Sequence, residues 1–490
     1  MHILSVEFLL FLMAVLGGYT FAPQRVRPYL LLVAGLFFYF QSGTVYFAIL
    51  MGSILIDYLC STGINRTDSQ KEKRYYLLFS LFCNIGLLIG FHIPASLFHL
   101  ILPLGLSFYV FKKISYMVDV YRGVILPEKN PFLLGLYVTF FPQIESGPIQ
   151  RAGDLIPQFL REYTFDYGKI TGGLKLIAWG LLKKIVIADR LAMFTNPVFR
   201  NPGSYPSGGI GLAVLFYSFQ VYADFSGYTD IAVGIAQIIG IDIPDNFNRP
   251  YSATGIAQFW RRWHMTLSTW LRDYLFLPLA VFFSNTIKHF SKLNAYKHMD
   301  GLIYIFSSTL TMTLCGLWHG FTWTFMVWGF FHGILLSLAF ITRKSRKHLR
   351  KKLIPKTMKT PYKYIRILLT FSNVTLLWIF FRAQTLQDAW FLLRRVIMLP
   401  LDIFNSLTGK DGILSLMPEE WIGKSLSKLI IVIVCMILMY IIHYIQPHDG
   451  MREMFSKRHR VIRWMLYVLI IVVIINFGVF GDVPFIYTQF

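Results

Sequence analysis

Acidic residues are scarce in this sequence of 490 residues, which has 25 Asp and Glu against 47 Lys and Arg. The basic excess lies in short runs between apolar stretches, as it does in the loops of multispanning membrane proteins. A nucleic-acid-binding protein would instead gather its basic residues on one surface. We therefore expect no nucleic-acid partner, although the formal net charge is +22.

The sequence also lacks the motifs of several enzyme classes. It has no GxSxG elbow, no Walker A motif, no GxGxxG after a strand and no HExxH. Its four cysteines, Cys60, Cys83, Cys315 and Cys435, lie in or beside apolar runs without CxxC spacing. This placement is typical of small buried side chains rather than of a disulfide framework or a zinc site. We therefore expect no metal site.

Hydrophobic residues make up 55% of the chain. A soluble domain of this length could not bury so much apolar surface, so the sequence predicts an all-α polytopic membrane protein. The first apolar segment lacks the basic region of a signal peptide, and it is long enough to remain as a transmembrane helix. The segments near 130–141, 229–241 and 257–283 are expected to be re-entrant or broken helices, because non-helical backbone at membrane depth must be buried in protein.

The whole chain is expected to cross the membrane about 11 times, since a straight crossing needs roughly 20 apolar residues. The candidate segments lie near 3–21, 29–41, 45–60, 75–92, 97–111, 130–141, 172–188, 209–223, 229–241, 302–318, 321–341, 365–382, 428–446 and 464–480. No internal repeat is evident, which predicts a single membrane domain over 1–490. Within it we expect N-terminal helices in 1–125, a catalytic core in 126–340, and a basic loop with C-terminal helices in 341–490.

Basic residues in the loops predict the orientation. The run 343–366 holds 11 basic residues and no acidic one, which makes it the strongest cytoplasmic marker in the chain. The basic loop near 452–463 is cytoplasmic by the same rule, so 383–427 and the C-terminus are expected outside. Basic residues also follow the first, third and fifth apolar segments, among them Arg25, Arg66 and Lys112, so the N-terminus is expected outside as well. Contact with anionic membrane lipid is the plainer alternative to any substrate role for the run 343–366.

Polar side chains within apolar sequence are candidates for function, because burying them in a membrane costs free energy. One concentration of such residues lies in 245–278. On a continuous helix Trp260, His264 and Ser268 would share one face. An amphipathic helix on the membrane surface is an open alternative. The candidate substrate-binding residues of this segment are Trp260, Arg261, Arg262, Ser268, Arg272 and Asp273.

A second candidate is His319, which lies where two strongly apolar segments meet. Trp318, Trp323 and Trp328 surround it in the sequence, and burial among them favours the neutral imidazole that a general base requires. Trp318 is a further candidate for substrate binding. A hydrogen-bonded structural histidine is the alternative. His332 is too far from His319 in the sequence to form a metal-ligand pair with it.

Seven fragments together identify a family: 103–123, 140–151, 181–192, 222–251, 259–279, 314–333 and 484–490. They include FFPQIESGPIQR, FWRRWHMTLSTWLRDYLFLPL and LCGLWHGFTWTFMVWGFFHG. With them the chain resembles the membrane-bound O-acyltransferase (MBOAT) family, in particular the bacterial branch typified by the membrane subunit of alginate O-acetyltransferase. One stretch departs from the pattern, because residues 280–290 read AVFFSNTIKHF where relatives often carry a GGNR-like turn.

The resemblance implies a helical core with a tunnel between its two faces. The family's catalytic histidine maps onto His319, which would act as general base. A second motif histidine maps onto His264, which would have a direct catalytic or orienting role, with a part in the tunnel structure as the alternative. Arg261, Arg262 and Arg272 would bind donor phosphates or mark the cytosolic boundary.

The function implied by the resemblance is acyl transfer in the bacterial plasma membrane. A cytosolic thioester, acetyl-CoA or another acyl donor, would supply the group as a substrate, with no bound cofactor. The acceptor would be an exopolysaccharide or peptidoglycan, reached through a separate exported acetyltransferase. D-alanyl transfer to teichoic acid from a carrier-protein thioester is an alternative within the class, and a transporter or flippase is an alternative outside it.

Overall fold

The computed structural model describes residues 5–98, 103–290, 296–409, 412–422, 426–445, 459–481 and 485–486, and over these residues the secondary structure is helical without a strand. The chain divides into two compact units. Within the described residues, the first unit holds the chain up to Trp179 together with Tyr228–Asp245, and the second holds Gly180–Gly227 and the chain from Asn246 to Ile486. The predicted division into 1–125, 126–340 and 341–490 stays a prediction.

The first unit is built from helices in the N-terminal third of the chain. They are α1 (Val6–Phe21), α2 (Arg27–Phe40), α3 (Thr44–Arg66), α4 (Gln70–Phe98), α5 (Leu106–Tyr121), α6 (Pro131–Thr139), α7 (Phe141–Ile144), α8 (Ala152–Phe159) and most of α9 (Tyr167–Leu181). Local sequence signals start several of them. The Ser5 hydroxyl accepts the Phe8 N–H at the start of α1, and Asn130 does the same for Phe132 before Pro131 in α6.

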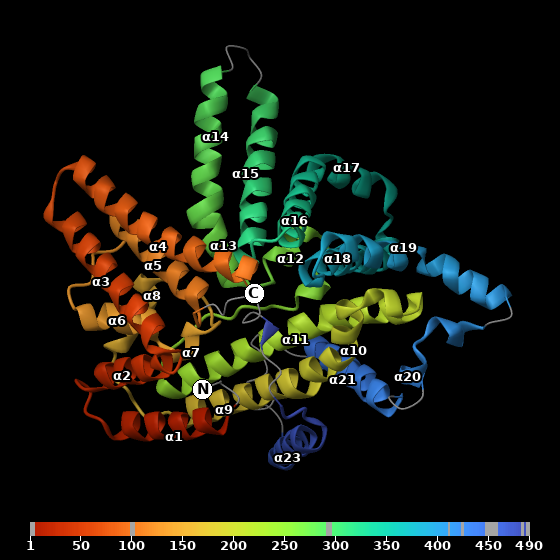
Figure 1. The fold of residues 1–490 in the computed structure, drawn as a ribbon, viewed down its shortest axis with the longest axis horizontal. Helices are drawn as coiled ribbons and strands as arrows, with labels where there is room; N and C mark the ends of the chain where they lie inside the picture. The colour runs from red at the N-terminus through yellow and green to blue at the C-terminus, as the bar shows by residue number, and fades with distance from the viewer. Residues whose placement is uncertain are drawn as a thin grey trace. The chain divides into compact units, whose positions relative to one another are not determined.

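The second unit holds the longer list of helices, which are drawn from yellow-green to blue in Figure 1. They are α10 (Asp189–Arg200), the part of α11 (Ser207–Ile239) up to Gly227, α12 (Ile256–Trp260), α13 (Met265–Leu271), α14 (Leu277–Phe290), α15 (Tyr296–His319), α16 (Trp323–Ile341), α17 (Arg343–Leu353), α18 (Lys359–Arg382), α19 (Leu386–Thr408), α20 (Glu419–Ile422), α21 (Leu426–Ile445) and α23 (Arg460–Phe477). Two π-helical stretches, Leu182–Ala188 and Arg272–Phe276, interrupt the α-helical geometry.

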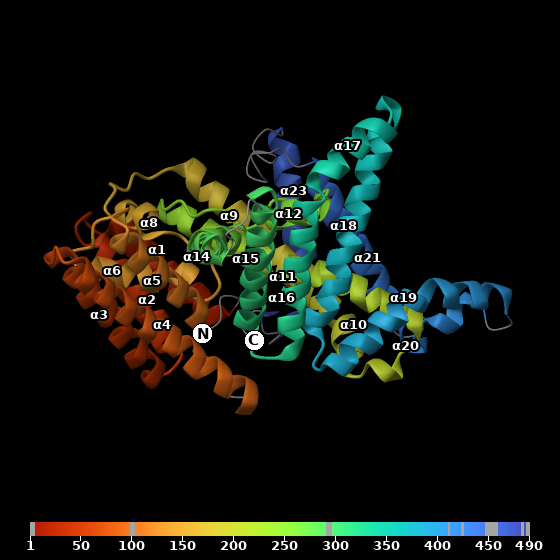
Figure 2. The same cartoon turned by 90° about the horizontal axis from the view of Figure 1, so that it is seen from above.

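Within the second unit, α14 and α15 lie side by side as two long helices (Figure 1), and α16 packs closely along α15. Figure 2 shows α15, α16 and α18 as neighbours. The helices α16 and α18 also contact each other directly. This group of three helices carries most of the aromatic side chains of the candidate site.

Six helices of the described chain are long and apolar enough to cross a membrane by length and composition. They are Thr44–Arg66, Gln70–Ile93, Met299–His319, Trp323–Ile341, Lys359–Arg382 and Arg460–Phe477. The last of these has no buried residue, so a continuous apolar surface of isoleucine, valine and leucine faces outward. An apolar surface of this kind is what a helix presents to lipid. The prediction of an all-α polytopic membrane protein is confirmed, whereas the count of about 11 crossings and the tunnel stay predictions.

Several predicted segments are confirmed and others are wrong. The breaks near 130–141 and within 257–283 are present, since α6 ends before Phe140 and α12, α13 and a π-helical turn follow one another. The separate segments 209–223 and 229–241 are instead one helix of 33 residues, α11. The expectation that 229–241 is a re-entrant or broken segment is therefore wrong. The polar residues along α11 are buried in protein, with Asp224 1% exposed. The loop predicted over 383–427 contains the unpredicted helix α19, started by a Thr385 cap.

Candidate functional site

The candidate site belongs to the second unit and begins with the helical pair α15–α16. Three glycines let the two backbones approach closely. A methyl group on Gly316 would overlap the carbonyl oxygen of Phe325, one on Gly329 would overlap that of Met312, and one on Gly333 would lie 2.5 Å from a backbone carbon. Small residues at helix interfaces serve this purpose in membrane proteins, where van der Waals packing must hold the helices together. The close packing fixes the two helices relative to each other.

His319 is the last residue of α15 and is only 5% exposed. Its imidazole is surrounded by aromatic rings. Ring centroids lie at 4.4 Å for Trp318, 5.0 Å for Phe381, 5.4 Å for Trp328 and 6.2 Å for Phe325. The prediction that tryptophans enclose His319 is therefore correct for Trp318 and Trp328 but wrong for Trp323, whose side chain is 68% exposed. Phe381 comes from α18, so a third helix closes the site.

His264 lies in a sharp bend between α12 and α13, and it is 1% exposed. Its backbone has φ 42°, a left-handed conformation that costs a non-glycine residue free energy and that often marks a functional position. The bend makes the predicted arrangement of Trp260, His264 and Ser268 on one helical face wrong. The chain between α12 and α13 is held away from helical geometry because Asn246 accepts the N–H of Met265 at 2.9 Å.

Asn246 also fixes the hydrogen position on His264. The side-chain oxygen Oδ1 of Asn246 accepts the Thr266 N–H at 3.3 Å and the Thr266 hydroxyl at 2.6 Å, and it lies 3.3 Å from His264 Nδ1. A backbone N–H can only donate, which identifies this atom of Asn246 as the oxygen. His264 Nδ1 must then carry the hydrogen, so the neutral ring has its lone pair on Nε2.

A series of ring contacts connects the two predicted histidines. Trp263, next to His264 in the sequence, lies with its ring centroid 5.0 Å from that of Trp378 on α18. Trp378 is 5.2 Å from Phe381, whose ring lies 5.0 Å from His319. The structure thus places both histidines on one aromatic cluster within the second unit.

The remaining predicted residues divide between buried and exposed positions. Trp260 is buried and its indole N–H faces His332 at 3.3 Å, while the Ser268 hydroxyl donates to the Trp263 carbonyl at 3.1 Å. Arg272 and Asp273 form an ion pair at 2.7 Å, with the arginine side chain 61% exposed. An ion pair at this exposure contributes little to stability.

The other two arginines, Arg261 and Arg262, are exposed and half-buried, respectively. The Arg262 guanidinium reaches the Arg249 carbonyl at 3.5 Å. Arg249 is the second non-glycine residue with a left-handed backbone, at φ 48°. Three arginines therefore lie in the same short region of the second unit, where a phosphate-bearing ligand could meet them.

A buried ionic cluster lies beside His264 and was not predicted from the sequence. Lys184 contacts Asp189 at 2.8 Å and Asp224 at 2.7 Å, and the second oxygen of Asp224 accepts the Ile486 N–H at 2.8 Å. Phe485 then packs on Phe225, whose ring lies 4.6 Å from the His264 imidazole. Phe225 on α11 therefore packs directly against His264, and the contacts of Phe485 and Ile486 with α11 support this part of the site.

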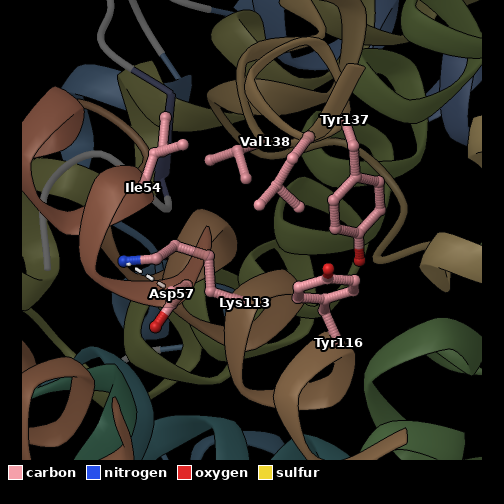
Figure 3. A pocket seen from close by; sticks show the side chains of 7 residues that line it. Ile54, Asp57, Lys113, Tyr116, Tyr137 and Val138 are labelled. Atoms are coloured by element: carbon pink, nitrogen blue, oxygen red, sulfur yellow. Dashed lines mark ion pairs between the residues drawn. The ribbon is translucent and has the colours of Figure 1, made fainter. Parts of the chain in front are cut away.

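The first unit contains a separate polar cluster around Asp57 (Figure 3). Lys113 lies 3.4 Å from the Asp57 carboxylate, which also accepts the Ser80 hydroxyl at 2.6 Å and the Asn84 amide at 3.0 Å. A small hollow beside the pair is lined by Ile54, Asp57, Lys113, Tyr116, Leu134, Tyr137 and Val138. Since its carboxylate is well supplied with donors, this cluster serves to join α3, α4 and α5. Across the described residues, no three His, Cys, Asp or Glu side chains gather as metal ligands.

The model of the MBOAT, membrane-bound O-acyltransferase family matches residues 130–381. This chain belongs to that family. The matched range contains His264, His319 and the α15–α16 pair. An O-acyltransferase activity follows from the family and from the relatives, and the apolar helices agree with a multi-pass membrane protein.

Three of the relatives that match this chain carry different names. The peptidoglycan O-acetyltransferase of Helicobacter pylori is 35% identical over 436 residues, which is 80% of this chain and 76% of that protein. The probable alginate O-acetylase AlgI of Azotobacter vinelandii is 34% identical over 406 residues, 79% of this chain and 76% of that protein. The teichoic acid D-alanyltransferase of Streptococcus thermophilus is 29% identical over 312 residues, 59% of this chain and 70% of that protein.

Some residues of this MBOAT site could not be predicted from the sequence. Asn246 lies in the fragment 222–251 that carries the family resemblance, but its contact with His264 joins positions 18 residues apart across a bend. Trp378 and Phe381 come from α18, outside every fragment that carried the resemblance. The aromatic richness of 374–381 is the one sequence signal that could have indicated them.

Proposed function

We propose that this O-acyltransferase moves an acetyl group from a cytosolic thioester such as acetyl-CoA to an extracytoplasmic polysaccharide or peptidoglycan. A separate exported acetyltransferase would complete delivery to the glycan. The observation that carries the proposal is the buried His319 at the junction of α15 and α16, within the range that the family model matches. The two relatives named as acetyl-transferring enzymes match about four-fifths of this chain, at 80% and 79%.

His319 is proposed as the general base. Its imidazole takes the proton of the acceptor hydroxyl while the hydroxyl oxygen attacks the thioester carbonyl carbon. The carbon–sulfur bond then breaks, and the leaving thiolate takes the proton from the imidazolium. Oxygen–carbon bond formation and carbon–sulfur bond cleavage balance, so the reaction needs neither a metal nor a redox partner.

His264 is proposed to act on the donor side. Its Nε2 lone pair is fixed by Asn246, so the ring can accept a hydrogen bond but, while neutral, cannot donate one from that atom. The nearby Arg261 and Arg262 supply positive charge for phosphate groups of the donor. The predicted orientation puts this region toward the cytosol and His319 toward the outer half of the protein.

The test is steady-state kinetics of the purified protein in detergent over a range of acetyl-CoA concentrations. His319→Ala should lower kcat by about 10²-fold or more, because a positioned proton acceptor acts in the transition state. His264→Ala should mainly raise the KM for the thioester. His348→Ala, on the exposed helix α17, is the matched control and should behave as the unchanged protein.

Each alternative has its own outcome. Residual activity above about a tenth in His319→Ala would contradict the general-base role, given the size expected of such catalysis. Turnover of a D-alanyl carrier thioester in place of acetyl-CoA would move the assignment to teichoic acid modification, the activity in the name of the Streptococcus relative. A transporter or flippase would consume no thioester at all.

A further inference from the structure

A third histidine, His332, lies in the same aromatic cluster and has no role in the scheme above. It projects from the middle of α16 and is 0% exposed. Its ring lies 4.8 Å from Trp328 and 5.1 Å from Trp260, measured between centroids, and it stacks on Phe259 at 6.4 Å. A polar ring so deeply placed in a membrane protein calls for a partner or a function.

The hydrogen position on His332 follows from its neighbour Trp260. The Trp260 indole nitrogen Nε1 lies 3.3 Å from His332 Nδ1. An indole N–H can only donate, so His332 Nδ1 accepts, and the neutral ring carries its hydrogen on Nε2. His332 is therefore locked in the opposite tautomer to His264.

The Nε2–H of His332 has no hydrogen-bond partner within the described part of the chain. Leaving a buried donor unpaired lowers the stability of a folded protein, so such groups are rare in native structures. When one persists, a ligand that binds it is a physical reason for its retention. Among acyl-transfer substrates, the carbonyl oxygen of the thioester is the group that most needs a donor, because negative charge develops on it.

The position of His332 relative to His319 is set by rigid backbone. Trp328 is in contact with both imidazoles, with ring centroids 5.4 Å from His319 and 4.8 Å from His332. Gly329 and Gly333, on either side of His332 in the sequence, are the points where α16 lies tightly against α15. A donor that stabilises a developing charge must be held in place before the reaction, and this packing does so.

We propose that His332 is a further catalytic residue whose Nε2–H donates a hydrogen bond to the acyl carbonyl oxygen of the thioester. The proposal rests on the proposed acyl transfer. When the acceptor oxygen attacks the carbonyl carbon, the electron pair of the C=O double bond moves onto the carbonyl oxygen. This electron pair re-forms the double bond as the carbon–sulfur bond breaks. The hydrogen stays on His332 throughout, while His319 moves the proton.

Two substitutions at His332 separate donation from packing. His332→Phe keeps a ring of similar size but removes the N–H, and kcat should fall by about 10²–10³-fold, the usual loss of one oxyanion donor. His332→Gln places an amide N–H near the position of Nε2 and should retain activity within about tenfold of the unchanged protein. Thermal unfolding of both variants in detergent, with His348→Ala as control, shows whether the fold is preserved.

A second measurement does not depend on the variants folding. Nitrogen NMR of protein labelled with ¹⁵N-histidine reports which ring nitrogen carries the hydrogen. The spectrum should contain a buried histidine with its hydrogen on Nε2, and Trp260→Phe, which removes the indole donor, should change that signal. A hydrogen on Nδ1 of His332 would overturn the proposal.

The outcomes distinguish this inference from the proposed function. If folded His332→Phe keeps more than a tenth of the kcat while His319→Ala is inactive, the acyl transfer stands and the role of His332 is refuted. A water molecule as the sole partner of Nε2–H would give this same result. If the unchanged protein consumes no thioester, both proposals fail together.

Discussion

Replacing Gly329 by alanine tests whether the close contact between α15 and α16 positions the site. The added methyl group would overlap the carbonyl oxygen of Met312, and backbone atoms cannot move aside as a flexible side chain can. Overpacking of this kind costs about 1–3 kcal/mol. An alanine in a helix otherwise gains about 0.5–1 kcal/mol over glycine, so the steric cost should exceed the gain and the variant should be less stable.

The effect on activity should be larger than the effect on stability. Relief of the overlap requires α16 to move away from α15, which displaces His332 and Trp328 relative to His319. A displacement of about 1 Å in a catalytic site can cost about 10²-fold in rate. We therefore expect a large loss of kcat in Gly329→Ala under conditions where the protein is still folded.

The matched control is Gly301→Ala in the same helix pair. Gly301 lies on α15, and a methyl group there would meet no atom within 4 Å. This variant should be as stable as the unchanged protein or slightly more stable, with full activity. Thermal unfolding in detergent and acetyl-CoA turnover measure both quantities. Equal behaviour of Gly329→Ala and Gly301→Ala would refute the reasoning.

Two further predictions concern the buried ion pair and the orientation. Asp57→Asn or Lys113→Met alone should destabilise the protein by about 3–5 kcal/mol, because each leaves one buried charge uncompensated, and the double variant should lose less. Thermal unfolding of the three variants measures this, and additive losses would contradict it. Cysteines placed within 343–366 should be shielded from an impermeant thiol reagent in intact cells, whereas those placed within 405–420 should react. The reverse labelling pattern would overturn the orientation predicted from the basic loops.

The parts of the site that the sequence predicted are local. His319 is enclosed by Trp318 and Trp328, which are near neighbours along the chain. The local composition alone therefore indicated that its imidazole lies in apolar surroundings. The long apolar helices were also predicted from local sequence, because about 20 consecutive apolar residues are typical of a membrane-spanning helix.

The parts that the sequence did not predict depend on distant contacts. The run FWRRWHM contains neither glycine nor proline, so nothing in it predicts the bend at His264. The left-handed backbone there is stabilised by Asn246, whose main-chain and side-chain oxygens accept the N–H groups of Met265 and Thr266. The helix α11 was divided into two segments for a related reason. Its two apolar segments each seemed too short for a crossing, and the contacts that keep Asp224 inside one continuous helix come from the distant Lys184 and Ile486.

The partners of His264 and His332 orient the two imidazoles without burying an additional charge. Asn246 fixes one ring through an amide oxygen, and Trp260 fixes the other through an indole N–H. A carboxylate could also accept a hydrogen bond from a histidine. Burying its charge would cost several kcal/mol for each ion, unless other groups fully compensate that charge. The carboxylate would also favour the charged imidazolium, which can no longer act as a base. Neutral partners avoid both effects, since they select a tautomer without changing the charge of the site. The neutral partner of each ring therefore determines its role in this core. Asn246 leaves His264 with an accepting Nε2, and Trp260 leaves His332 with a donating Nε2–H.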